Sequence, residues 1–319
     1  MPITKTHIGV LMGGASTERE ISLKTGKAIH AALTRRGYRA TMIDVDPSLP
    51  WALKKKKIAV AFLALHGPGG EDGTVQGLLD VLGIPYTGSG VRASAVGMDK
   101  AMTKVVVERE GVPVAPGITI RKGQGTVAPK NLRWPLVVKP VDQGSTVGVS
   151  IVHTPQQWAS AVRRARRQGS TIVVESFIKG RELAVSVLDG KALPTVEIVA
   201  PGGFYDYAAK YEKSETRYLC PAPITKVQDR QVKEFAVRSY QALGCQGAAR
   251  VDFRLNSAGR PFFLEINTIP GMTERSLLPM AAAKAGLSYE SLAERILESA
   301  LKGHTAKKGK SSQPKGKPR

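Results

Sequence analysis

Two short stretches, Arg250-Val-Asp252 and Glu265-Ile-Asn267, carry the pattern from which the fold of this chain is predicted. Residues 249–255 alternate in polarity and are rich in β-forming types, and Pro261–Asn267 has the same character. Between them, Asn256-Ser-Ala-Gly259 is typical of a turn. The pattern predicts a β-hairpin.

The hairpin brings chemically active side chains together. Side chains alternate between the two faces of a strand, so Arg250 and Asp252 share one face, as Glu265 and Asn267 do. A turn centred near Ala258 places Asp252 opposite Glu265, and two facing carboxylates repel unless a cation lies between them. Oxygen ligands without His or Cys favour a hard ion, so we predict a magnesium site at Asp252, Glu265 and Asn267.

A surface hairpin with solvated charges is the alternative interpretation. The residues beside the charges argue against it, because they are apolar and are expected to be buried, and a buried carboxylate pair needs a partner. These residues are Val251, Phe253, Phe262, Phe263, Leu264 and Ile266.

The composition indicates a globular protein with an anionic partner. The chain has 319 residues, 42% of them hydrophobic, which is enough for two or three domains. Its net charge is +21, and seven of its 47 lysines and arginines lie in the last 18 residues, which contain no acid. We therefore expect a disordered basic tail over residues 303–319. The rest of the chain stays basic, which suits a nucleotide, a nucleic acid or a membrane surface.

Other features narrow these classes. No RNA- or DNA-binding motif accompanies the charge, and no apolar run approaches the length that spans a bilayer. The first residues lack the apolar core of a signal peptide. Cys220 and Cys245 have no metal-ligand spacing, so free thiols in a cytoplasmic protein are expected, without membrane insertion.

The first 95 residues alternate between strand and helix. An apolar strand, residues 8–12, leads into a glycine loop, residues 13–18, and a second, residues 58–65, leads into the glycine-rich loop 66–73. This order predicts a doubly wound α/β domain with a parallel sheet, in which ligands bind beyond the carboxyl ends of the strands. One glycine loop alone would be a tight turn. Two glycine loops at the same edge of the sheet, each with a charged residue, predict a ligand-binding site.

The middle of the chain adds features that suit phosphate. A helix begins at Lys100, and a strand that carries Lys139 leads into Gly144-Ser-Thr-Val-Gly148, whose glycines permit close approach of the backbone to phosphate. With the acidic hairpin, these residues describe a nucleoside triphosphate site with metal between the phosphates and the carboxylates. Residues 202–215 are polar, aromatic and weakly periodic, as is typical of a lid loop.

With these motifs in place, the chain closely resembles the D-alanine–D-alanine ligases of the ATP-grasp superfamily. The matching stretches follow one another up to about residue 301. They are Gly13-Gly-Ala-Ser-Thr-Glu-Arg-Glu-Ile-Ser22, Ala64-Leu-His-Gly-Pro-Gly-Gly-Glu-Asp-Gly73, Tyr86-Thr-Gly-Ser-Gly90, Met98-Asp-Lys100, Lys139-Pro140 with Gly144–Gly148, Phe204-Tyr-Asp-Tyr207 with Lys210-Tyr211, and Glu265-Ile-Asn-Thr-Ile-Pro-Gly-Met-Thr273.

The resemblance implies a fold and a reaction. The fold would be α/β, with the doubly wound parallel-sheet domain over residues 1–95, followed by a two-lobed ATP-grasp fold with a central lobe over 96–178 and a C-terminal lobe over 179–302. One D-alanine would take the γ-phosphoryl group of ATP, and the amine of a second would attack this acyl phosphate. The product, D-alanyl-D-alanine, would serve peptidoglycan synthesis. Two Mg²⁺ ions, replaceable by Mn²⁺, and a homodimer are also implied.

The resemblance also implies roles for single residues. Glu18 would hold the ammonium group of the first D-alanine with His66 nearby, and Arg250 and the Gly271 amide would stabilise the acyl phosphate and the oxyanion. The carboxylate of the second D-alanine would lie at Ser276 and Leu277. Glu18, Ser145 and Tyr211 would form the hydrogen-bonded set that closes the lid.

The nucleotide would lie in a hinge between the two lobes. Glu175 would accept from the exocyclic amine of adenine, Phe177 would flank the ring, and Glu182 would bind the ribose hydroxyls, with Ile178 of the hinge also binding the nucleotide. The phosphates would meet Lys100, Lys139, Ser145 and Lys210, with Asn267 joining both the nucleotide and the metal.

Two alternatives remain at this stage. A ligase of the same architecture could use D-lactate or D-serine as its second substrate. A nucleotide-binding regulator or a basic nucleic-acid-binding protein could retain the fold without turnover, although the cluster of Arg250, Asp252, Glu265 and Asn267 is costly for a purely structural domain.

Overall fold

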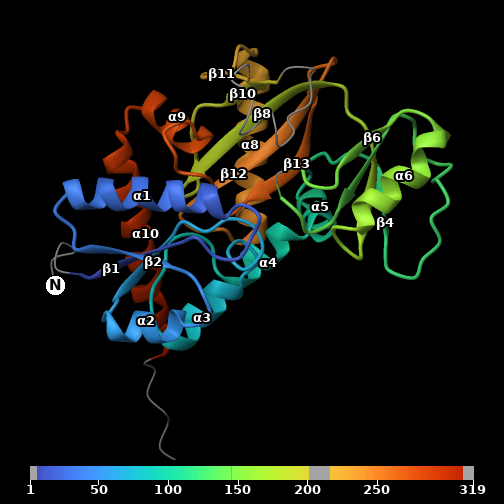
Figure 1. Cartoon of the computed structure of the whole chain (residues 1–319). Coiled ribbons are helices and arrows are strands. Elements are labelled where there is room, and N and C mark those ends of the chain that lie inside the picture. The colour runs from blue at the N-terminus through green and yellow to red at the C-terminus, as the bar shows by residue number, and fades with distance from the viewer. Residues whose placement is uncertain (1–5, 145, 201–215, 312–319) are drawn as a thin grey trace, which may run out of the picture.

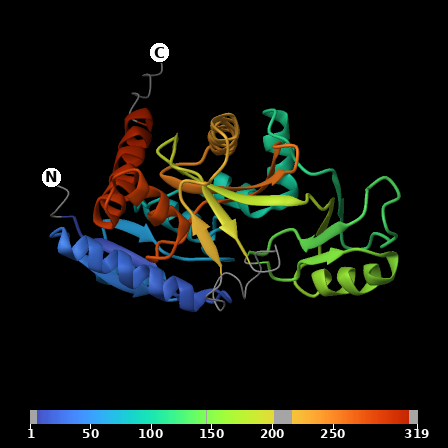
Figure 2. The ribbon, with the colours of Figure 1, turned by 90° about the horizontal axis from the view of Figure 1, so that it is seen from above.

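We describe the fold from a computed structural model, which covers residues 6–144, 146–200 and 216–311, with residues 302–311 described by their backbone alone. Three sheets follow one another along the molecule. In both views the N-terminal domain lies at one end, the small sheet with α6 lies at the other, and the largest sheet lies between them (Figures 1 and 2). Within the described ranges, no helix is long and apolar enough to cross a membrane.

The N-terminal sheet is parallel and covered on both faces, as predicted. Its strands have the order β2-β1-β3. Alternate residues of each strand enter two different cores, one under α1 and one under α2 and α3. The bounds are β1 (Ile8–Met12), α1 (Arg19–Arg35), β2 (Ala40–Asp44), α2 (Leu49–Lys55), β3 (Val60–Leu63) and α3 (Thr74–Leu82).

The second sheet is a four-stranded antiparallel unit. Its strands have the order β4-β7-β5-β6. Helix α6 (Pro155–Arg166) packs on it through Trp158, Ala161, Val162 and Ala165. Arg163, Arg164 and Arg167 are exposed, as a solvated face requires, whereas Arg166 is half-buried and donates to the carbonyl of Gln124 at 3.0 Å. The strands are β4 (Gly117–Ile120), β5 (Leu136–Pro140), β6 (Ser150–Val152) and β7 (Ile172–Ser176).

The third sheet is the largest and contains the predicted hairpin. Its strands have the order β11-β10-β8-β12-β13, with β9 paired to β8. They are β8 (Gly180–Leu188), β9 (Lys191–Ala192), β10 (Val196–Val199), β11 (Arg217–Leu219), β12 (Ala248–Asn256) and β13 (Pro261–Asn267). Together with the second sheet it forms the two-lobed fold, so the predicted fold class is confirmed.

Three helices cover one face of this sheet. Helix α8 (Lys226–Leu243) begins with a capping box between Thr225 and Gln228, which satisfies two backbone N–H groups, and ends at Gly244 in the left-handed conformation. Helix α4 (Val91–Met98) spans the boundary expected near residue 95, and it packs with α5 (Lys100–Arg109) on α8 and β13. The start of α5 therefore lies beside the acidic hairpin.

The hairpin register is the one that the sequence predicts. Asp252 pairs with Glu265 and Arg250 with Asn267. A bulge after Asp252 shifts the register, so that Phe253 faces Phe263. Phe253 and Phe263 are buried with their rings 6.1 Å apart, edge to face, whereas Phe262 and Leu264, also expected to be buried, are only half-buried because they face a cavity.

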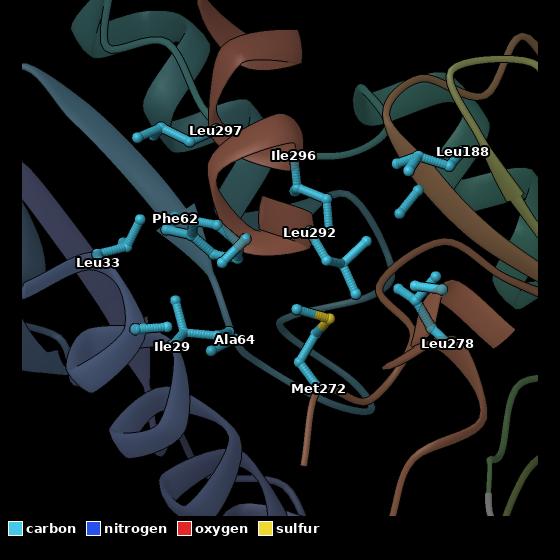
Figure 3. Close-up of a cluster of buried hydrophobic side chains, with 14 of the residues drawn as sticks. Ile29, Leu33, Phe62, Ala64, Leu188, Met272, Leu278, Leu292, Ile296 and Leu297 are labelled. Carbon is cyan, nitrogen blue, oxygen red and sulfur yellow. The ribbon is translucent and has the colours of Figure 1, made fainter. Parts of the chain in front are cut away.

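The N-terminal domain and the largest sheet share a hydrophobic core. Ile29 and Leu33 of α1 and Phe62 of β3 face Leu292 and Ile296 of α10 (Tyr289–Ser311) (Figure 3). Met272, Leu278 of α9 (Leu277–Lys284) and Leu188 of β8 complete this core (Figure 3). This shared core fixes the glycine loops of the first domain relative to the hairpin.

Helix α10 continues into the segment expected to form the basic tail. We predicted a disordered tail over residues 303–319; the backbone of residues 303–311 continues α10, which ends at Ser311, and residues 312–319 lie outside the described part. Extending an existing helix costs far less than nucleating one, and Ala306 and the lysines 307, 308 and 310 are good helix formers.

Deletion of residues 303–319 tests whether this extension packs on the body. Among the residues of α10 whose side chains are described, the buried ones lie from Leu292 to Ala300 and precede the deletion. We expect circular dichroism to lose about one short helix and the free energy of unfolding to change by less than ~0.5 kcal/mol. A clear drop in thermal stability would mean that the extension contacts the folded body.

Candidate active site

A cavity lies between the second and third sheets, at the hinge that joins β7 to β8. Eight residues predicted for nucleotide or metal line it: Lys100, Lys139, Glu175, Phe177, Ile178, Glu182, Asp252 and Glu265. Its other walls include Val137, Val149, Phe262 and Leu264. Apolar walls with a few converging polar groups are typical of a small-molecule site.

A buried carboxylate lies between two lysines at the centre of this cavity. Glu175 is only 3% exposed, and its Oε1 accepts a hydrogen bond from Lys139 Nζ at 2.6 Å, while Lys104 pairs with its Oε2. Burial, with Lys100 nearby, lowers the pKa of Lys139 to about 8. Burial also lowers the pKa of Lys104, with Lys139 and Lys100 acting in the same direction.

The predicted metal ligands lie side by side, and each has a protein partner. Asp252 accepts two hydrogen bonds of 2.8 Å from Arg250, Glu265 lies 3.4 Å from Lys100 Nζ, and Asn267 Oδ1 accepts from the backbone N–H of Ile269 at 2.8 Å. Across the described ranges, no group of three or more His, Cys, Asp or Glu side chains is arranged to hold a metal.

This donor set fits a hard cation that is shared with another ligand. Two carboxylates and an amide oxygen give too few ligands for Mg²⁺, which takes six oxygens and is commonly bound by one or two carboxylates with substrate phosphates. Arg250 and Lys100 now supply the positive charge beside Asp252 and Glu265. A metal would bring such charge to the same carboxylates.

The glycine loops of the first domain meet the central lobe beside this cavity. Ser16 Oγ donates to the carbonyl of His66 at 2.7 Å, which ties the two loops together as the sheet-edge argument predicts. A Cβ added to Gly144 would lie 3.2 Å from Glu18 Oε2, so the Glu18 carboxylate closely approaches the glycine turn. Lys100 Nζ donates to the carbonyl of Gln143 at 2.7 Å. The turn is therefore approached by Glu18 from the N-terminal domain and by Lys100 from α5, which packs on the third sheet.

His66 has an enclosed position. Its ring is buried, with Nε2 3.3 Å from Thr25 Oγ1 and Nδ1 3.5 Å from Glu71 Oε1. These contacts orient the ring and connect the loop to α1. His66 therefore contributes to the structure of the loop, in addition to its predicted place near a substrate.

The residues predicted for the second substrate gather at the start of α9. A Cβ on Gly271 would lie 2.9 Å from Ser276 Oγ, and this oxygen accepts from the backbone N–H of Thr273 at 3.0 Å. Ser276 is the N-cap of α9, whose first residue is Leu277. The unpaired N–H groups and the dipole of a helix N-terminus favour a carboxylate.

Part of the predicted set cannot be placed. Ser145, Lys210 and Tyr211, together with the expected lid loop 202–215, lie outside the described residues. Their assignments stay predictions.

Two charged residues were not predicted from the sequence: Arg254 lines the cavity, and Lys104, which does not line it, pairs with Glu175. Lys104 lies one helical turn after Lys100 on α5, and this spacing could have indicated a shared face. Arg254 lies two residues after Asp252 on β12, so strand alternation places it on the same face as the predicted metal ligands. What sequence could not supply was their partners, Glu175 for Lys104 and Glu182 for Arg254.

Comparisons with known proteins agree with this geometry. The family described as D-ala D-ala ligase N-terminus matches residues 7–59 and 52–89, and the family described as D-ala D-ala ligase C-terminus matches residues 106–298. A D-alanine–D-alanine ligase from Syntrophotalea carbinolica is 51% identical over 93% of this chain and 97% of its own length. One from Geobacter sulfurreducens is 48% identical over 94% of this chain and 97% of its own length.

Solved structures give the same result. The D-alanine–D-alanine ligase from Bacillus anthracis complexed with ATP superposes with a TM-score of 0.84 at 35% identity, over 95% of this chain and 99% of that one. The ligase from Coxiella burnetii gives a TM-score of 0.84 at 29% identity, over 97% of both chains. The chain belongs to the D-alanine–D-alanine ligase family.

Proposed function

We propose that this chain joins two D-alanines to D-alanyl-D-alanine with cleavage of ATP to ADP and phosphate, supplying a precursor of peptidoglycan. The observation that carries the proposal is the pairing of Asp252 with Glu265 at a cavity that Lys100 and Lys139 also line, so that carboxylates able to share a metal lie beside cations able to meet phosphates. A site with this charge pattern favours polyphosphate. The sequence relatives carry this ligase name, and the Bacillus anthracis neighbour is a complex with ATP.

The nucleotide assignment follows from the cavity walls. Adenine would lie between the apolar side chains and the hinge, where Glu175 and Phe177 line the cavity. Glu182 would accept from the ribose hydroxyls, and Lys100 and Lys139 would face the phosphates, where their charges offset those of the phosphate oxygens. Lys210 and the Ser145 turn would add to this set.

Asp252, Glu265 and Asn267 are the residues that would hold Mg²⁺, as two ions, with Mn²⁺ as a substitute. When bound, the metal would neutralise charge on the phosphates. The other contributions to the reaction would come from groups of the chain itself. Arg250 and the Gly271 amide would stabilise negative charge at the reacting carboxyl group, and Glu18 would hold the ammonium group of the first D-alanine.

The second D-alanine would bind where α9 begins. Its carboxylate would face Ser276 and the N-terminus of α9 beside Leu277. Its amine would then attack the first substrate. Positioning two bound reactants replaces a bimolecular encounter in solution, and this is the principal contribution that the protein would make.

The test is ADP release from ATP and Mg²⁺ with a panel of D- and L-amino acids and D-lactate. We expect release with D-alanine, and D-alanyl-D-alanine as product. Release only with D-lactate or D-serine as second substrate would establish the alternative ligase, and no release with any pair would remove the proposed reaction.

Tyr211→Phe tests the choice of second substrate. Tyr211 would join Glu18 and Ser145 in closing the lid and help select the amino acid. The resemblance implies that tyrosine at this lid position goes with dipeptide formation and phenylalanine with depsipeptide formation. We expect the variant to raise the share of D-alanyl-D-lactate, most at low pH, where the free amine of D-alanine is scarce. Product ratios measured from mildly acidic to mildly alkaline pH check this, and ratios equal to those of the parent chain would refute the role of the hydroxyl.

We further propose a cytoplasmic homodimer. Free Cys220 and Cys245 suit a reducing compartment, and ATP is a cytoplasmic substrate. Light scattering of the purified chain measures its mass in solution, and a monomer at assay concentration would contradict the dimer.

A further inference from the structure

Arg254 is a buried cation that the proposed reaction leaves without a role. It lies on β12 directly opposite Glu182 of β8, and its side chain is only 9% exposed. A buried guanidinium is costly unless its N–H groups are paired, so its partners indicate its role.

The guanidinium contacts three residues that line the nucleotide cavity. Its Nη1 lies 3.1 Å from Glu182 Oε2, and its Nε donates to the backbone carbonyl of Ile178 at 3.2 Å. Its Cζ also lies 5.7 Å from the centre of the Phe177 ring, within the range of a cation–π contact. One side chain from β12 therefore joins the hinge residues to the carboxylate at the start of β8.

The geometry of arginine suits this task. The guanidinium is planar, always charged, and presents donors in a fixed fork, so it can hold a carboxylate and a carbonyl at the same time. Lysine has a single nitrogen on a flexible stem and cannot reproduce the fork. A carboxylate that must accept from two ribose hydroxyls gains from being fixed in one rotamer before the ligand arrives.

We infer that Arg254 is a positioning residue for the ribose of the nucleotide, and that it acts through Glu182. This inference rests on the proposed nucleotide site and adds the residue that would set its preference for ribose. The measurable consequence is that the preference of the chain for a ribonucleotide over a nucleotide without ribose hydroxyls depends on Arg254.

The experiment compares the binding of ADP·Mg²⁺ and 2′,3′-dideoxyADP·Mg²⁺ to the full chain by calorimetry, without D-alanine. In the parent chain ADP should bind more tightly. Arg254→Met, which keeps the length of the side chain, should lower the ratio of the two affinities about tenfold, the size expected for a lost hydrogen bond to a charged group. Arg254→Lys should give an intermediate ratio.

Two further variants separate positioning from general damage. Glu182→Gln should reduce the same ratio, and Arg254→Met added to it should cause no further change, because Arg254 acts through this carboxylate. Arg181→Met is the matched control. Arg181 also holds a carboxylate, that of Glu197, with two hydrogen bonds of 2.6 Å, but it lies outside the cavity. Its loss should leave the ratio unchanged.

The outcomes distinguish this inference from the proposed function. A parent-like ratio in Arg254→Met or in Glu182→Gln overturns the inference while ADP binding leaves the nucleotide site intact. If Arg254→Met does not fold, Arg254→Lys and Glu182→Gln decide the matter by the same criterion. Ribose preference that depends on Arg254, in a chain that releases no ADP with D-alanine, would support the inference and overturn the proposed ligase reaction instead.

Discussion

Glu265→Gln is expected to lower the rate of D-alanyl-D-alanine formation at least about 100-fold, while the folded structure is retained. The substitution changes little volume, but it removes one of the two facing carboxylates of the β12–β13 hairpin. Asp252 alone would hold a metal and its phosphates poorly. Outside the metal site, Glu265 lies 3.4 Å from Lys100 Nζ, and glutamine keeps the shape of the side chain, so the variant is expected to fold.

Turnover measured over a range of Mg²⁺ concentrations checks this expectation. Glu197→Gln is a matched control, because Glu197 is a glutamate of the same sheet that pairs with Arg181 outside the cavity. It should turn over D-alanine at close to the parent rate. Near-normal turnover of Glu265→Gln at saturating Mg²⁺ would end the assignment of Glu265 as a metal ligand.

The sequence predicts the hairpin well because its information is local. A strand period of two, together with a turn after residue 255, is enough to place Asp252 opposite Glu265. The bulge after Asp252 cannot be predicted from such local information. It depends on how Phe253 and Phe263 pack in the core, and no pattern in the hairpin itself predicts it.

The surroundings of Glu175 show the limit of such reasoning. The resemblance gave it a place at adenine, and it does line the cavity. Sequence could not show that Lys104 of α5 and Lys139 of β5 both pair with it, since α5 reaches this carboxylate only through its packing on α8 and β13. Partners of a buried charge come from tertiary structure, and motifs alone do not reveal them.

The helical extension near the C-terminus has a related cause. Composition predicted disorder from residue 303 because the segment is basic and lacks apolar residues. Composition does not register that the segment continues a helix already stabilised by Leu292, Ile296 and Leu297. A helix that is nucleated by packing extends into residues that would not form it alone.

Arg250→Met should affect both turnover and stability. We expect a loss of about 10²- to 10³-fold in turnover, because Arg250 would stabilise charge that develops at the reacting carboxyl group. We also expect a lower melting temperature without ligand. Asp252, whose side chain is 8% exposed, loses both of its hydrogen bonds to Arg250, and removing one partner of a buried ion pair costs about 3 kcal/mol.

These two effects have different causes, and a second substitution separates them. In Arg250→Met/Asp252→Asn the unpaired carboxylate is gone, so thermal stability should recover in large part while turnover stays low. ADP·Mg²⁺ should stabilise Arg250→Met more than it stabilises the parent, because a bound metal gives Asp252 a new positive partner. If the double variant is as unstable as Arg250→Met, the unpaired Asp252 is not the source of the instability. If Arg250→Met turns over normally, the guanidinium does not act on the reacting carboxyl group.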